Sequence, residues 1–497
     1  MEIKFDQSSC RCLRRLVSQV QQRELTQEVR LPEAMPDIGR VLGSWGQVLV
    51  RGKEWNSGAM TVSGGIMAWV LYAPEDGSEP RSLETWIPFQ MKWDLPETER
   101  DGFICVLPRL KSIDARSTSA RKIMVRPNIS LLGKAMIGSD AELYRPAQTP
   151  EDVQLLTNSY PMELPMESGE KLFQLDEELT LPGTYPAVEK LLRYEMAVQI
   201  TEQKVMASRL VFKGKGLLRL LYCSDGAVYA WETEIPFSQF ADLDRDYGSE
   251  AVAVITPMVT NLEVDAAEGR LLVKAGVAAQ FVILDRVMVE LTEDAYSPMR
   301  QVRCQYDEVS LPARLDQRTE QLQMSETVNA EASKVVEICW LPDHPQLQHN
   351  GDVTALRMTG TAQVLYYDAA GNLQCGTVRY EQEQALAADA GTDVDATIRE
   401  NGEVQAIISG GSIELSAGYW LDTAVYAGRP QTMVTGLELS DTAQADPGRP
   451  SLILRRYDSS RLWDIAKENG STVEAIRRAN QLQGDPTQGQ MLLIPVS

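Results

Sequence analysis

Two histidines and a nearby cysteine are the residues best suited to catalysis or zinc binding in this sequence. His344 and His349 lie five residues apart in LPDHPQLQHNG, and Cys339 precedes them in the apolar run VVEICW. A thiol next to an imidazole can act as a nucleophile, and two imidazoles can begin a zinc site. No nucleophile elbow surrounds Cys339, and the sequence singles out no further zinc ligand. We therefore predict neither catalysis nor a metal site here.

Carboxylates are numerous, but they form no motif. Seventy Asp and Glu residues leave paired acids for glycoside cleavage open by number alone, yet no muramidase-like motif stands out. The stretch 381–403 has seven acidic residues against one basic, without the spacing or central Gly of a calcium loop. A GxxxxGK[ST] phosphate loop is missing from the sequence. We predict a protein that is not an enzyme and that uses no cofactor.

Charge and hydropathy restrict which binding partners and which cellular compartment we predict. The formal charge is −22, and such a surface repels nucleic acid and anionic lipid headgroups. The N-terminus has no apolar core of signal-peptide length, and the apolar stretch 271–284 is too short to span a bilayer. We expect a cytoplasmic protein without membrane insertion. Its seven cysteines, an odd number, are expected to be reduced, with Cys10 and Cys12 near the start of a helix.

Internal repetition organises the chain. Residues 31–72 align without a gap to residues 181–222, with eight identities in 42 pairs, where chance gives about two or three. A weaker third copy is seen where GTAQVLYYDAAGN, starting at Gly360, matches GLLRLLYCSDGA, starting at Gly216. Apolar runs that end in acidic-Gly turns indicate hairpins. We predict three tandem, related, antiparallel and sandwich-like β-rich domains.

The predicted boundaries follow from these repeats and from composition. Short helices are expected around IGRVL and VEKLL, and DTAQADPGRP reads as a flexible linker. The predicted segments are a helical lead-in over 1–24, β-rich units over 25–148, 170–300 and 315–440, a linker over 441–450, and a small module over 451–497.

The last module is read from its own pattern. SLILRRY and MLLIPV are strand-like, and RLWDIAKENG is helical up to Asn469-Gly470. STVEAIRRANQL opens with Ser471 and Glu474 in capping-box spacing. This strand–helix–helix–strand order, with LWDIA, TVEAI and GQ.LLIP, resembles the LysM module, which is best known for binding N-acetylglucosamine-containing glycans such as peptidoglycan.

The LysM resemblance implies a binding groove between two loops. The usual Gly-Asp-Thr of the first loop is replaced by Ser459-Ser460-Arg461, so a protein ligand is an alternative to a glycan. Trp463 fits the buried face of its helix better than a ligand-stacking role. The candidate binding residues are Ser459, Ser460, Arg461, Leu462, Trp463, Gln483, Gly484, Asp485 and Thr487.

The run LPEAMPDIGRVL (31–42), followed by β-rich repeats and a C-terminal LysM module, resembles the SipL-type spore coat morphogenetic proteins, whose repeats are called SPOCS domains. That resemblance implies a scaffold or adaptor in endospore coat assembly. Such proteins work in the mother-cell cytoplasm at the forespore surface, where their LysM domain docks to the coat morphogenetic ATPase. The alternative is a peptidoglycan-binding structural protein of the cell or spore envelope, and a wall hydrolase ranks third.

Overall fold

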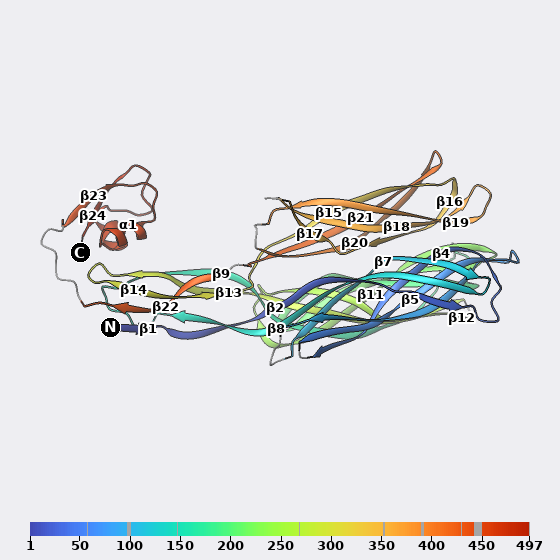
Figure 1. Ribbon diagram of the computed structural model, residues 1–497, viewed down its shortest axis with the longest axis horizontal. Coiled ribbons are helices and arrows are strands. Elements are labelled where there is room, and N and C mark those ends of the chain that lie inside the picture. Colours follow the sequence, from blue (N-terminus) through green and yellow to red (C-terminus); the bar gives the residue numbers. More distant parts are fainter. Residues whose placement is uncertain are drawn as a thin grey trace.

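The computed structural model is an elongated, antiparallel β protein with a small helical module at one end (Figure 1). Strands make up 76% of the chain and helices 3%, so the prediction of a mainly β fold is confirmed. Neither helix in the described part of the chain is long and apolar enough to cross a bilayer. The structure describes residues 1–56, 58–96, 101–146, 148–267, 269–350, 353–388, 392–428, 430–441 and 450–496.

Three units of the chain share one strand order. In each unit the first strand pairs with the sixth and the sixth with the fifth, while the second, third and fourth strands form the other sheet. In the first unit the first strand is divided into β2 and β3. Its strands are β2 (Asp6–Glu24), β3 (Gln27–Arg30), β4 (Ile38–Asn56), β5 (Ala59–Pro74), β6 (Arg81–Asp94), β7 (Phe103–Ser119) and β8 (Lys122–Arg145).

The second and third units repeat this order with local changes. In the second unit β10 folds back on itself near Ala207 and supplies two strands, with Lys213 bonded to Glu202 across the bend (2.8 Å). The second unit contains β9 (Gln154–Leu179), β10 (Lys190–Ser224), β11 (Ala227–Tyr247), β12 (Val252–Ala267) and β13 (Arg270–Tyr296). The third contains β15 (Arg314–Asn329), β16 (Ala332–Pro342), β17 (Gln346–Asn350), β18 (Val353–Asp368), β19 (Leu373–Leu386), β20 (Asp393–Ser409) and β21 (Ser412–Tyr426). Here β16 and β17 pair with successive parts of β18 and together form the second strand.

Each of the first two units makes the same internal hydrogen bond, at positions that are identical in their sequences. The Tyr72 hydroxyl donates to the carbonyl of Pro36 (3.1 Å), and the Tyr222 hydroxyl donates to the carbonyl of Pro186 (3.2 Å). Both tyrosines are fully buried, so a paired hydroxyl avoids the cost of a stranded polar group. The aligned Pro and Tyr residues therefore have a common structural role in the two units.

A glycine opposite an aromatic residue recurs in all three units. A Cβ atom at any of these glycines would collide with a carbonyl oxygen of the preceding strand. The sequence comparison matched Gly360 to Gly216, but the pairing equates it with Gly214, so that alignment is wrong by two residues. A shift of two keeps every side chain on its own face of the strand, and an alternating apolar pattern does not reveal it. The cross-strand pairs are Gly64–Phe89, Gly214–Phe237 and Gly360–Tyr380.

The helical lead-in predicted over residues 1–24 is wrong. Residues 6–24 form β2, which pairs with β8 from Asp6 opposite Arg145 to Glu24 opposite Asn128. Cys10 and Cys12, two residues apart, lie buried on one face of this strand, and burial raises the pKa of the Cys12 thiol to about 11. The short helices expected around residues 38–42 and 188–192 are also absent, because these segments enter the sheets. Strand pairing decides these conformations rather than local pattern.

An arm of strands extends from the units toward the C-terminal module (Figure 1). It contains the outer ends of β2, β8, β9 and β13, together with β1 (Glu2–Lys4), β14 (Val302–Val309) and β22 (Gln431–Leu439). The first strand of the chain pairs with β22, with Ile3 opposite Leu437. Most of the predicted linker lies outside the described residues, since residues 442–449 are not described.

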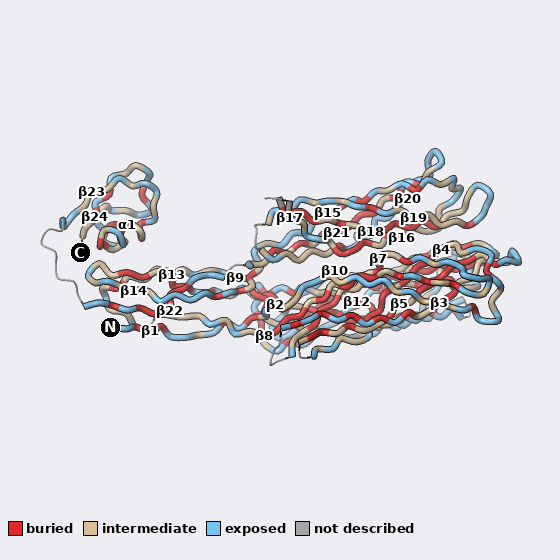
Figure 2. Tube along the Cα trace, in the orientation of Figure 1, coloured by how far each residue is buried: buried red, intermediate tan, exposed pale blue. Residues whose placement is uncertain are grey.

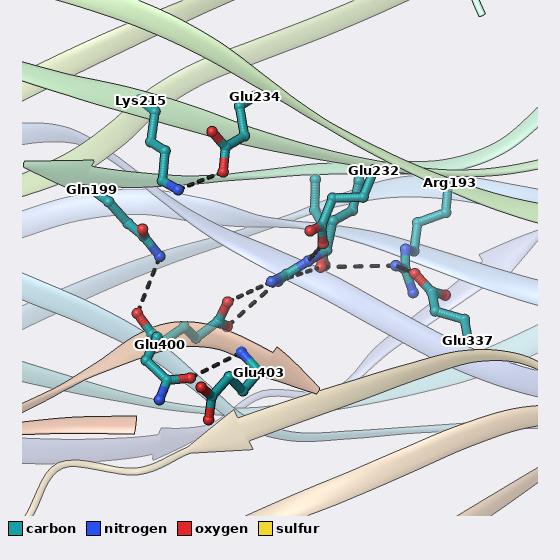
Figure 3. Close-up of polar contacts among 11 residues, drawn as sticks. Arg193, Gln199, Lys215, Glu232, Glu234, Glu337, Glu400 and Glu403 are labelled. Carbon is teal, nitrogen blue, oxygen red and sulfur yellow. Dashed lines mark hydrogen bonds and ion pairs between the residues drawn. The ribbon is translucent and has the colours of Figure 1, made fainter. Parts of the chain in front are cut away.

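Ion pairs join the third unit to the other two, and Figure 3 shows part of this junction. Arg193 of the second unit is buried and pairs with Glu337 of the third (2.6 Å), and Arg219 pairs with Glu400. In most of these pairs the first two units supply the cation and the third the anion, but Arg314 of the third unit pairs with Glu163 of the second (2.6 Å). The pairs with the first unit are Arg15–Asp393, Arg15–Asp395 (2.6 Å), Lys134–Asp395 (3.0 Å) and Lys111–Asp343 (2.9 Å).

Next to this junction, the buried His344 makes stability depend on pH. Burial, and to a smaller degree the nearby Arg109, lower the pKa of His344 to about 3, whereas a histidine in an unfolded chain has a pKa of about 6.5. Between these two pKa values, the unfolded chain binds a proton at this histidine that the folded chain does not. The free energy of unfolding should therefore fall by up to about 1.4 kcal/mol per pH unit between about pH 6 and 4.

Urea midpoints at pH 7, 6 and 5 test this prediction. His344→Gln should reduce the pH dependence by this amount, while His349→Gln should keep it, because His349 is exposed on β17. An unchanged slope in His344→Gln would contradict the assignment.

Candidate functional site

The C-terminal module has the predicted strand–helix–helix–strand order. β23 (Leu452–Arg456) pairs with β24 (Met491–Pro495), and α1 (Leu462–Glu468) and α2 (Val473–Ala479) lie between them in the chain. The cap of α2 differs from the prediction: Thr472, not Ser471, accepts the backbone N–H of Ala475 (3.0 Å). The buried core of the module contains Leu462, Trp463, Ile465, Ala466, Ile476, Leu492 and Ile494.

The first loop of the candidate groove keeps a glycine-like turn without a glycine. Ser459 has φ = 72°, in the left-handed region that favours glycine. The Asp458 carboxylate accepts hydrogen bonds from the Ser460 side chain, from the backbone N–H of Ser460 (3.1 Å) and from Arg455 (3.3 Å), and these bonds lower the pKa of Asp458 to about 2. Arg461 is exposed and pairs with Asp464 (3.0 Å). Side-chain bonds thus hold the turn that a glycine would otherwise permit.

The second loop leads from α2 into β24 at the same end of the sheet, since Met491 lies opposite Arg456. Arg477 of α2 contacts the Gly484 carbonyl (3.4 Å) and the Asp485 carboxylate (3.1 Å). The backbone N–H of Thr487 donates to the side chain of Gln490 (3.0 Å). Two backbone bonds of Tyr457, to Gln490 and Gly489, connect the bases of the two loops (2.8 and 2.9 Å). The loops therefore border one surface, which we call the rim.

The rim contains seven of the nine candidate residues. Six of these seven residues are exposed to solvent and Ser460 is half-buried, whereas Leu462 is part of the core. Trp463 is 8% exposed and does not project into the rim. The seven rim residues are Ser459, Ser460, Arg461, Gln483, Gly484, Asp485 and Thr487.

Trp463 instead contacts the tip of the arm. Its indole N–H donates to Asp294 (2.8 Å), and its ring meets the Tyr296 ring edge-on at 4.7 Å. Lys467, one turn further along α1, pairs with Asp294 (2.7 Å), and the Tyr296 hydroxyl donates to the carbonyl of Ser471 (3.0 Å). Burial raises the pKa of Asp294, but the bonds from Lys467 and Trp463 outweigh burial and lower it.

Sequence reasoning missed this contact. Asp294 and Tyr296 are more than 160 positions before Trp463, and no local motif marks either residue. Lys467 has a weak signal, since it lies four residues after Trp463 on the same helix face.

The residues that could have carried catalysis are not assembled. Burial raises the pKa of the Cys339 thiol well above its ordinary value, which disfavours the thiolate that a nucleophile requires. His344 is 2% exposed, while His349 is exposed and near Thr354 (3.2 Å). Within the described residues no group of three or more His, Cys, Asp or Glu side chains could hold a metal ion.

The fold and the rim define a class of protein: a long antiparallel β body with a C-terminal module of the LysM type. Comparison with protein families agrees, since residues 461–495 match the LysM domain. Residues 187–267, within the second unit, match the family described as SipL, SPOCS domain. The resemblance to SipL-type proteins is thereby confirmed at these two segments. No curated protein and no solved structure matched the chain.

Asp294→Asn should loosen the module from the arm. The change removes the charge partner of Lys467 and weakens the acceptor of Trp463, while the core of the module is untouched. We expect backbone amide exchange at residues 291–296 and 462–471 to rise about tenfold, or about 1.4 kcal/mol. Glu290→Gln, at an exposed position of the same strand, should leave exchange unchanged. Unaltered exchange in Asp294→Asn would show that the contact does not fix the module.

Ser459→Gly should stabilise the module. A glycine adopts φ = 72° without the steric cost that Ser459 bears, so we expect a gain of about 0.5–1 kcal/mol. The matched control is Ser460→Gly, which should destabilise, because Ser460 has no positive φ. Hydrogen exchange of the α1 amides in the full chain measures both effects, and slower exchange in Ser460→Gly than in Ser459→Gly would refute the argument.

Proposed function

We propose that this protein is a non-enzymatic scaffold in endospore coat assembly. It works in the mother-cell cytoplasm, where its LysM rim docks to the coat morphogenetic ATPase at the forespore surface. SPOCS and LysM are non-catalytic domain families, and their combination fits a sporulation-related protein. The observation that carries the proposal is the position of the rim, which is open to solvent at the far end of a long β body (Figure 2).

Protein docking agrees better with this rim than sugar stacking does. The aromatic ring best placed to stack on a sugar, Trp463, packs against Tyr296 and is bonded to Asp294. Arg461 takes the place of a small polar residue and is 67% exposed. An exposed guanidinium paired with one carboxylate can exchange it for a carboxylate of a protein partner.

The three units are the structural part of the proposed scaffold. We propose that all three are SPOCS-like repeats, although the family match falls in the second. The predicted bounds of 25–148, 170–300 and 315–440 need revision at the first two starts, because β2 and β9 begin at Asp6 and Gln154 and open the first two units. The common strand order of the units and their recurring glycine–aromatic pairs support descent from one unit.

Peptidoglycan binding is the second candidate function. One observation favours it: residues 461–495 match a domain family known for glycan binding. The positive-φ turn at Ser459 also preserves the backbone shape of the first loop.

Arg461→Asp should weaken binding of the full chain to the ATPase by about tenfold or more. The change places a carboxylate beside Asp464, and a partner carboxylate would meet repulsion instead of a salt bridge. Arg478→Asp is the matched control, because Arg478 is 78% exposed on α2 outside both loops. In sporulating cells a fluorescent fusion of the natural sequence should form a shell around the forespore, and the Arg461→Asp fusion should spread through the mother cell.

Binding to purified peptidoglycan separates the two candidates. Micromolar binding of the full chain to peptidoglycan, with none to the ATPase, would reverse their order. Equal losses in Arg461→Asp and Arg478→Asp would remove the rim from the binding surface.

A further inference from the structure

The strand β20 changes surroundings halfway along its length. Its first half lies against the other units: Arg109 donates to the Ile398 carbonyl (2.6 Å), and Gln199 donates to the Glu400 carbonyl (3.3 Å). A bulge follows between Glu400 and Val404, where the register with β21 shifts. Beyond the bulge, no hydrogen bond or ion pair within the described residues joins the strand to the first or second unit.

The second half of β20 is an open sheet edge. Residues 404–409 pair with β21 on one side, from Val404 opposite Ala417 to Ser409 opposite Ser412. In the described part of the chain no strand pairs with their other side. The N–H and C=O groups along such an edge are available to another strand.

This edge lacks the usual protection against pairing. Its sequence, VQAIIS, has no charge and no proline, and its β-branched side chains are unusually exposed: Val404 38%, Ile407 57% and Ile408 42%. Natural edge strands are normally blocked by Lys, Pro, bulges or covering elements. Here the bulge precedes the open segment and leaves it free. An uncharged aliphatic edge on a chain of net charge −22 indicates a surface kept for contact.

We propose that residues 404–409 pair antiparallel with the same segment of a second copy of this chain. A two-fold axis through Ile407 places it opposite the partner's Ile407, with Gln405 opposite the partner's Ser409 and Ala406 opposite the partner's Ile408, so that paired side chains share one face of the sheet. In this register Glu403 faces the partner's Gly411, so no two carboxylates meet across the axis. The surface thus complements itself, as a closed two-fold dimer requires, and elsewhere the acidic chains repel each other.

The proposed contact is small, and its affinity should be modest. Six residues on each strand bury less area than the roughly 1,200 Å² of a standard interface, which places the dimer among weak associations. A dissociation constant on the order of 10 μM corresponds to such a contact. This pairing uses none of the LysM rim, so it is independent of the proposed docking.

Sedimentation of the full chain from about 1 to 100 μM tests the pairing. The natural sequence should show a monomer–dimer equilibrium in this range, and amides of residues 404–409 should exchange more slowly as concentration rises. Ile407→Lys should raise the dissociation constant at least tenfold, because two lysines would approach each other across the axis. The variant should keep the thermal transition, since the substituted side chain is exposed.

The matched control is Leu315→Lys, on β15 of the same unit, whose side chain is 59% exposed. It should dimerise like the natural sequence. A chain that stays monomeric up to about 100 μM would overturn the proposal. A dimer that is unaffected by Ile407→Lys, or one equally weakened by Leu315→Lys, would also overturn it.

Discussion

The pairing of β9 with β13 is the constraint on which the rest of the structure depends. It runs from Leu179 opposite Leu271 to Gln154 opposite Tyr296, through the second unit and on into the arm. Side chains two apart on a strand share a face, so Asp294 and Tyr296 both project toward Trp463. One ladder therefore fixes the core of the second unit, the length of the arm and the seat of the terminal module.

Ion pairs are concentrated at the junction of the third unit. Most of them join cations of the first two units to carboxylates of the third, whereas Arg314 of the third unit pairs with Glu163 of the second. Buried ion pairs add little stability over apolar packing, but the loss of one partner strands a charge and costs about 3–5 kcal/mol. The pairs therefore act mainly through specificity: a shift of the third unit by one strand would leave Arg193 and Glu337 buried without partners.

Repeats and local motifs were predictable from the sequence, and long-range contacts were not. The identities Pro36/Pro186 and Tyr72/Tyr222 marked a hydrogen bond made in both units. The sequence alignment of the third copy is displaced by two residues, because side chains two apart on a strand share a face and the pattern does not reveal such a shift. The prediction of a helix over the first 24 residues is wrong, because their pairing with β8, which makes them a strand, leaves no local signal in the sequence. LPEAMPDIGRVL seemed the most distinctive run, yet the family match falls on residues 187–267.

The candidate site also has a part that the sequence predicts and a part that it does not. The positions of its loops followed from the order of strands and helices, and seven of nine candidate residues do line the rim. The position of Trp463 also depends on a strand tip encoded far earlier in the chain. The arm contacts α1 at Trp463 and Lys467, while most loop side chains stay open to solvent, so anchoring and exposure use different residues of the module. Ser459 adopts a φ of 72°, which favours glycine, while Arg461 adds an exposed charge beside it. The backbone shape and the charge of the rim are therefore set by different residues.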